Sequence, residues 1–128
     1  LGAFADFQFE RWPSFRELAP RGIVYDMAFA GFIRGAYVGT TAWDHPWVSP
    51  IEGDLADYPL AVVVAGTHDP IVASVRAFAR RIRDAGGRTV DYFPEGMPHG
   101  FYFFPGVHPE EDVAYRVVAE ALADVLDR

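Results

Sequence analysis

The second half of the chain shows a regular alternation of apolar runs and amphipathic segments. Residues 60–65 form a continuous apolar run, which is typical of a strand buried on both faces. Apolar positions at helical spacing predict a helix over 71–85, with Gly86-Gly87 as its C-terminal stop. A second strand is predicted over 89–93, and a last helix over 109–127. This order of elements is typical of the end of an α/β domain with a parallel sheet.

The first half of the chain gives weaker patterns. Residues 1–9 are apolar with loose alternation, which fits the end of a strand or a buried loop. Ser14 and Glu17 fit a capping box, which predicts a short helix that ends before the next proline. A second helix is predicted over 23–38, and residues 39–59 form a long irregular stretch of the kind that is usually functional or connecting.

The predicted sheet is incomplete. Two predicted strands, and part of a third at most, are marginal as a sheet, and a parallel sheet needs cover on both faces. Because the chain starts at Leu1, directly inside apolar sequence, we expect either that another piece completes the fold or that the chain is a fragment.

Length, composition and charge narrow the functional classes. A chain of 128 residues with 51% hydrophobic and 23% charged residues is one ordinary globular domain. Its net charge is −7, and its positive side chains are all arginines with no basic face, so nucleic-acid binding is improbable. The absence of cysteine removes disulfides and thiolate chemistry. No apolar run approaches the ~18 residues of a membrane span and no signal peptide is visible, so we expect a cytoplasmic protein.

Two polar residues follow the two predicted strands and are the best candidates for chemistry. Asp69 comes directly after strand 60–65, and His99 lies in the loop after strand 89–93. Because neighbouring parallel strands end at the same edge of a sheet, the two side chains are expected within about 2.6–3.2 Å of each other. A carboxylate that orients an imidazole base is one half of a catalytic triad. Taken singly, Asp69 also fits a turn or helix cap, and His99 a loop histidine without a role.

Several segments of the chain resemble a known family from about residue 20 to the end. The matching segments are Trp47-Val48-Ser49-Pro50 with Asp54-Leu55, the strand that leads to His68-Asp69-Pro70-Ile71, and Gly96-Met97-Pro98-His99-Gly100-Phe101. They resemble the C-terminal half of α/β-hydrolase-fold esterases of the hormone-sensitive-lipase-like family. The resemblance implies that Asp69 and His99 are the acid and the base of a Ser-His-Asp triad in ester hydrolysis, without a cofactor or metal.

The chain departs from the family pattern at the nucleophile. Neither a G-x-S-x-G elbow nor a His-Gly-Gly-Gly oxyanion segment is present, and the only serines are Ser14, Ser49 and Ser74. We therefore expect the nucleophile in an upstream half of the same fold. On this view residues 1–58 are cap and connecting helices with a loop, and residues 59–128 are the strand–helix–strand–helix unit that carries the acid and the base.

The resemblance also implies residues that bind the substrate. Met27, Phe29 and Phe32 match the family region that shapes the acyl pocket, and Phe101 is a second candidate for lining it. Core packing is the competing interpretation for these residues. The expected substrate is a small uncharged carboxylic ester, and a homo-oligomer is left open. The alternative hypothesis is a non-catalytic or degenerate hydrolase fragment that acts as a binding or structural module.

Other ligand chemistry finds little support. None of the four histidines lies three or four positions from another, and no acidic cluster attends them, so a metal site is not expected. A phosphoacceptor role for Asp69 lacks the acidic pair for Mg²⁺ and the lysine that such a domain needs.

Overall fold

The protein is described by a computed structural model that covers residues 4–22 and 25–127. Its helices and strands are α1 (Pro13–Leu18), α2 (Met27–Val38), β1 (Ala61–Val64), α3 (Val72–Asp84), β2 (Thr89–Tyr92) and α4 (Pro109–Leu126). Short 3₁₀ turns cover Phe9–Arg11, Ala19–Arg21, Pro50–Glu52 and Phe101–Phe103. The helix and strands predicted over residues 60–93, and the last helix, are confirmed within one or two residues at each end.

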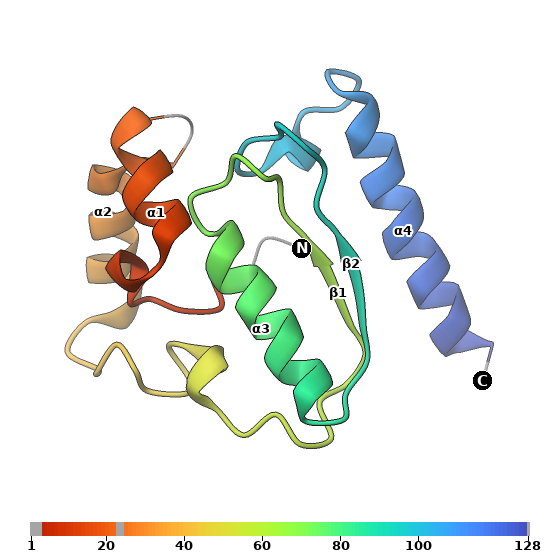
Figure 1. The fold of residues 1–128 in the computed structure, drawn as a ribbon, viewed down its shortest axis with the longest axis horizontal. Helices are drawn as coiled ribbons and strands as arrows, with labels where there is room; N and C mark the ends of the chain where they lie inside the picture. Colours follow the sequence, from red (N-terminus) through yellow and green to blue (C-terminus); the bar gives the residue numbers. More distant parts are fainter. Residues whose placement is uncertain (1–3, 23–24, 128) are drawn as a thin grey trace.

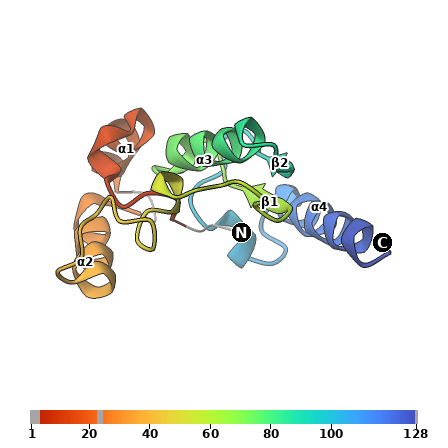
Figure 2. The same ribbon diagram turned by 90° about the horizontal axis from the view of Figure 1, so that it is seen from below.

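The centre of the fold is a two-stranded parallel sheet covered by a helix on each face. Strand β1 pairs with β2, with Val64 opposite Tyr92 in the register. Helix α3 lies on one face and α4 on the other (Figures 1 and 2). Val63 packs in the core cluster that holds Val75 of α3, whereas Val64 packs with Ala114 of α4. Successive side chains of β1 therefore pack against the helices on opposite faces of the sheet, as expected for parallel strands with flanking helices.

The sequence patterns predicted the end of helix α1 but not how it begins. Helix α1 starts at Pro13, a residue suited to the first helical position, and ends before Pro20 as predicted. The predicted capping box is wrong: the Ser14 hydroxyl donates to the Pro70 carbonyl at 2.7 Å and accepts from the Ala73 amide at 3.1 Å. Ser14 thus ties α1 to the start of α3 instead of capping its own helix.

Helix α2 begins at Met27 rather than at residue 23, and residues 23–24 of the predicted helix lie outside the described residues. The Asp26 carboxylate accepts a hydrogen bond from the Phe29 amide at 2.7 Å, which is a helix N-cap. Since Asp26 is in an extended conformation, the helix cannot start before it.

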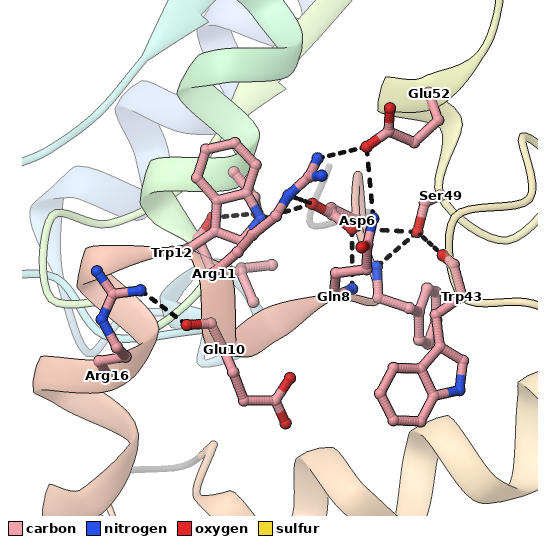
Figure 3. Close-up of polar contacts among 12 residues, drawn as sticks. Asp6, Gln8, Glu10, Arg11, Trp12, Arg16, Trp43, Ser49 and Glu52 are labelled. Carbon is pink, nitrogen blue, oxygen red and sulfur yellow. Dashed lines mark hydrogen bonds and ion pairs between the residues drawn. The ribbon is translucent and has the colours of Figure 1, made fainter.

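Residues 4–8 form a buried loop, which was one of the two interpretations of the first segment; residues 1–3 lie outside the described residues. The buried carboxylate of Asp6 holds this loop in place (Figure 3). It accepts hydrogen bonds from the Gln8 amide at 2.8 Å, the Trp12 indole at 2.6 Å and the Ser49 hydroxyl at 3.2 Å, and Arg11 pairs with it at 2.6 Å.

The same group of side chains fastens the long stretch 39–59 to the first segment. Ser49 is fully buried, and its hydroxyl accepts from the Phe7 amide at 2.8 Å while it also contacts the Trp43 carbonyl. Arg11 forms a second ion pair, with Glu52 at 2.6 Å (Figure 3). We call Asp6, Gln8, Arg11, Trp12, Ser49 and Glu52 the Asp6 cluster. It orders an irregular segment that has little secondary structure of its own.

Candidate active site

The loops after β1 and β2 run side by side and are joined by backbone hydrogen bonds. The Thr67 amide donates to the Pro94 carbonyl and the His68 amide to the Met97 carbonyl, both at 3.0 Å. The Thr67 hydroxyl also accepts from the Gly96 amide at 2.8 Å. This pairing extends the parallel register beyond the strands, and it carries Asp69 and His99 to the same edge of the sheet.

Asp69 is buried, with 2% of its surface exposed, and its two oxygens have different partners. Oδ1 accepts from the Ile71 amide at 2.9 Å, which closes a turn at the start of α3. Oδ2 lies 2.9 Å from Nδ1 of His99. Asp69 therefore forms the turn with one oxygen and the hydrogen bond to His99 with the other.

His99 is oriented as a base would be. Because the Asp69 carboxylate accepts hydrogen bonds, it favours the neutral tautomer that carries its proton on Nδ1 and has the lone pair on Nε2. Nε2 has no hydrogen-bond partner in the part of the chain that the structure describes, and 17% of the side chain is exposed. The predicted distance between the two side chains is confirmed; their catalytic roles stay a prediction.

Aromatic side chains surround the imidazole. The Tyr25 ring centroid lies 5.1 Å from that of His99, and the Phe4 ring is stacked on His99 at 6.3 Å. Burial, with a smaller contribution from the Asp69 carboxylate, raises the pKa of Tyr25 far above its usual value. The same two causes, in the same order, raise the pKa of Tyr102 to about 12. Both phenols are therefore neutral at physiological pH.

The residues predicted to bind substrate divide into two groups. Met27, Phe29 and Phe32 are exposed on α2, and the Phe29 ring lies edge-on to Tyr25 at 5.5 Å. Phe101 has no exposed surface and packs in the core with Val64, Tyr102 and Ala114. The α2 side chains thus offer surface to a ligand, whereas Phe101 supports the His99 loop from within.

An open apolar groove lies beside α2, with a volume of about 690 Å³. Its walls are formed by Phe4, Phe7, Ile33, Ala36, Tyr37, Trp47, Val48 and Pro50. Phe4 belongs both to this groove and to the surroundings of His99. Phe4 therefore connects the groove with the surroundings of His99, which does not itself line the groove.

The hydroxyls of the three serines are held by structural hydrogen bonds. Ser14 bonds to the start of α3, Ser49 lies in the Asp6 cluster, and the Ser74 hydroxyl donates to the Ile71 carbonyl at 2.8 Å. None of them bonds to His99 among the described residues. The chain therefore brings an acid and a base together without a serine nucleophile.

Other histidines have other surroundings. His68 is exposed and bonds to the neighbouring loop through its backbone, and the ring of His45 accepts from the Trp47 amide at 3.2 Å. Within residues 4–22 and 25–127 no group of three or more His, Asp or Glu residues could hold a metal ion. No helix in this part of the chain is long and apolar enough to span a membrane, and the cytoplasmic location stays a prediction.

Sequence reasoning missed three residues of this region. Phe4 and Tyr25 lie far from His99 in the sequence, and no spacing signal connects them to it. Gly66 follows an apolar strand directly, a position where a glycine often marks a close backbone approach. Of the three residues, only Gly66 could have been identified from the sequence.

Solved structures of hydrolases share this fold. A hormone-sensitive lipase from a metagenome library is 23% identical, with a TM-score of 0.87 over 94% of this chain and 41% of that chain. A mutant of the esterase E40 is 22% identical, with a TM-score of 0.84 over 94% of this chain and 41% of that one. An esterase from Pyrobaculum calidifontis is 23% identical, with a TM-score of 0.76 over 88% and 38%.

The chain thus spans about two fifths of the length of the structures that it matches. A search of curated proteins found no match. The sequence profile of a family described as "alpha/beta hydrolase fold" matches residues 5–103, which include the Asp6 cluster, both strands and the paired Asp69 and His99. The chain belongs to this α/β-hydrolase-fold family, and its two parallel strands with their flanking helices are a part of that fold.

Proposed function

We propose that this chain supplies the acid and the base of a serine-dependent carboxylic ester hydrolase, with Asp69 as the acid and His99 as the base. The hydrogen bond of 2.9 Å between Asp69 Oδ2 and His99 Nδ1 carries the proposal. Resemblance to solved structures of a lipase and an esterase supports the same reaction class. The serine and the oxyanion hole would come from an upstream half of the same fold, since the chain has no G-x-S-x-G segment.

The geometry of the pair suits proton transfer in both steps of acyl transfer. Nε2 of His99 takes the serine proton as the hydroxyl attacks the ester carbonyl, and then gives that proton to the leaving alcohol. In the second step Nε2 takes a proton from water, which attacks the acyl-enzyme, and returns it to the serine oxygen. Asp69 keeps the ring in the Nδ1–H form and stabilises the imidazolium that forms in each step.

The surroundings of the base favour a small uncharged ester. The apolar groove shares Phe4 with the surroundings of His99, and Met27, Phe29 and Phe32 add exposed apolar surface on α2. An acyl chain on this surface would bury apolar area without leaving a charge unpaired. We therefore assign the acyl side of the substrate to the α2 face of the site.

Ester hydrolysis by variants of the protein, joined to a serine-bearing half, tests this proposal. With p-nitrophenyl acetate and butyrate as substrates, His99→Ala should abolish most of the turnover because no group remains to move the proton. His68→Ala and His45→Ala are matched controls that should change the rate little, since neither ring hydrogen-bonds to Asp69 among the described residues. A loss of turnover in His68→Ala as large as that in His99→Ala would overturn the assignment of the base.

A second candidate is a non-catalytic module of the same fold. It is favoured by the three serine hydroxyls, which are all engaged in structural hydrogen bonds. If turnover is absent when a folded serine-bearing half is present, and the Asp69–His99 hydrogen bond is intact, this second function replaces the first.

A further inference from the structure

Tyr25 is a buried titratable residue that the proposed reaction does not use. Its side chain has no exposed surface, and its hydroxyl has no hydrogen-bond partner among residues 4–22 and 25–127. A buried hydroxyl without a partner costs about 1–3 kcal/mol, a cost that phenylalanine would avoid. The contacts of the Tyr25 side chain with the described residues are therefore made by its ring.

The ring of Tyr25 connects the core to the imidazole. It contacts the core residues Phe9 edge-on at 6.1 Å and Phe4 at 5.6 Å, and it also contacts His99 at 5.1 Å. These distances lie in the range in which aromatic rings attract each other and limit each other's rotation. Because Phe4 also stacks on His99, two aromatic side chains from the N-terminal half of the chain contact one imidazole.

A single hydrogen bond does not fix an imidazole. The bond from Nδ1 to Asp69 holds one atom of the ring, and the Cα–Cβ and Cβ–Cγ torsions of His99 stay free to swing Nε2 away. A rigid neighbour on the face of the ring removes that freedom. Residues that hold a functional side chain within a few tenths of an ångström act in this way.

We propose that Tyr25 is a positioning residue for His99. The Tyr25 ring holds the imidazole in the orientation that directs Nδ1 to Asp69. This inference rests on the proposed function, because it concerns the same pair of residues. It adds a contact from Tyr25, the residue before the α2 N-cap, to a base that lies on the loop after β2.

Nuclear magnetic resonance of the ¹⁵N-histidine-labelled protein tests the inference. The Nδ1 proton of His99 is assigned as the signal that His99→Gln removes, and its exchange with water is measured. Tyr25→Phe keeps the ring and should leave the exchange rate unchanged. Tyr25→Leu removes the ring and should increase the rate by at least about tenfold, or broaden the signal beyond detection.

Phe15→Leu is the matched control. Phe15 is as buried as Tyr25 and contacts its ring at 6.4 Å, but it does not contact His99. It should lower the urea midpoint about as much as Tyr25→Leu and leave the His99 proton unchanged. Equal exchange in Tyr25→Leu and the unmutated protein, or an equal increase in Phe15→Leu, would overturn the inference; an increase in Tyr25→Phe would assign the effect to the hydroxyl and also overturn it.

Two further measurements apply if Tyr25→Leu does not fold. Tyr25→Met repeats the test with a flexible side chain that fills irregular space. In the unmutated protein, the ring contact requires nuclear Overhauser effects between the Tyr25 ring protons and the carbon-bound ring protons of His99, and their absence would contradict it. All these signals report the imidazole itself, so they can be read whether or not the protein hydrolyses esters.

Discussion

Gly66 and Met97 lie so close together that any side chain at position 66 would overlap the carbonyl of Met97. Gly66 is buried at the end of β1, and Met97 lies two residues before His99. Their close approach allows the His68 amide to donate to the Met97 carbonyl at 3.0 Å. The distance between the acid and the base therefore depends on a glycine that is neither of them.

Gly66→Ala should separate the two loops. The added methyl group meets backbone atoms, which cannot rotate away, so we expect a loss of about 3 kcal/mol or more in the free energy of unfolding. Gly31→Ala is the matched control, because position 31 is exposed on α2 with open space around it. It should stabilise the protein by about 0.5–1 kcal/mol. Urea denaturation measures both, and equal stability of the two variants would contradict the close approach.

Asp69→Asn should separate the two roles of this side chain. The asparagine carbonyl still accepts from the Ile71 amide, so the free energy of unfolding should change by less than about 1 kcal/mol. Its NH₂ group would face Nδ1 of His99 and favour the tautomer with the proton on Nε2. In the protein joined to a serine-bearing half, kcat for p-nitrophenyl butyrate should fall by several orders of magnitude.

Asp69→Ala provides the comparison for that prediction. It removes both hydrogen bonds, so it should lower stability by about 1–3 kcal/mol and also lower the rate. If Asp69→Asn destabilises the protein as much as Asp69→Ala, the Ile71 hydrogen bond does not survive the substitution and the separation of roles is wrong.

The Asp6 cluster should contribute strongly to stability. Its carboxylate is fully buried and has partners in three side chains and one backbone amide. Asp6→Ala leaves the Gln8 amide and the Trp12 indole without this acceptor and removes one partner each from Arg11 and Ser49, so we expect a loss of about 2–4 kcal/mol in the free energy of unfolding. Glu17→Ala, which removes an exposed ion pair of 3.6 Å with Arg21, is the control and should cost less than about 0.5 kcal/mol. Urea denaturation compares the two, and equal losses would show that the buried cluster contributes no more than a surface pair.

Buried tyrosines should make the protein unstable at high pH. Burial raises the pKa of Tyr102 to about 12, whereas in the unfolded chain the phenol ionises near the usual value of 10.0. A raised pKa in the folded state means that its contribution to stability is complete below pH 10 and is lost as the pH rises toward 12. The pKa of Tyr25 is raised in the same direction. Thermal melts between pH 9 and about 12 should therefore show a falling melting temperature.

Single substitutions show which tyrosine causes the fall in melting temperature at high pH. Tyr102→Phe should make the decline shallower, because one ionisation that favours the unfolded state is removed. Tyr37→Phe is the control, since Tyr37 is exposed and should leave the decline as it is. An unchanged decline in Tyr102→Phe would mean that other groups control stability at high pH.

Sequence patterns predicted the half of the fold in which local signals and tertiary packing agree. Strand β1 is a continuous apolar run, and α3 combines an apolar face with a glycine stop, so both could be located from the sequence alone. The pairing of Asp69 with His99 followed from parallel strand order. Ser14 shows the opposite case: its local pattern indicates a capping box, but a stronger partner, the Pro70 carbonyl, lies far away in the sequence.

The contacts around His99 could not be predicted for the same reason. Phe4 and Tyr25 reach the imidazole only after the first segment folds against the loop that follows β2. The Asp6 cluster likewise joins positions 6 and 49, which no sequence pattern connects. Patterns within one element reveal that element, whereas contacts between irregular segments depend on the whole packing arrangement.

The chain of 128 residues by itself should not hydrolyse esters. Acyl transfer needs a nucleophile within reach of the base, and oxyanion-hole donors usually lower the barrier by about 3–4 kcal/mol. The structure gives His99 an orienting carboxylate but no serine, because each serine hydroxyl is bonded elsewhere. The purified chain should therefore be inactive on p-nitrophenyl acetate and butyrate, and addition of a half that carries G-x-S-x-G should bring turnover that His99→Ala removes. Ester turnover by the chain alone that depends on His99 would refute this prediction and require a nucleophile among Ser14, Ser49, Ser74, Thr67 and Tyr102.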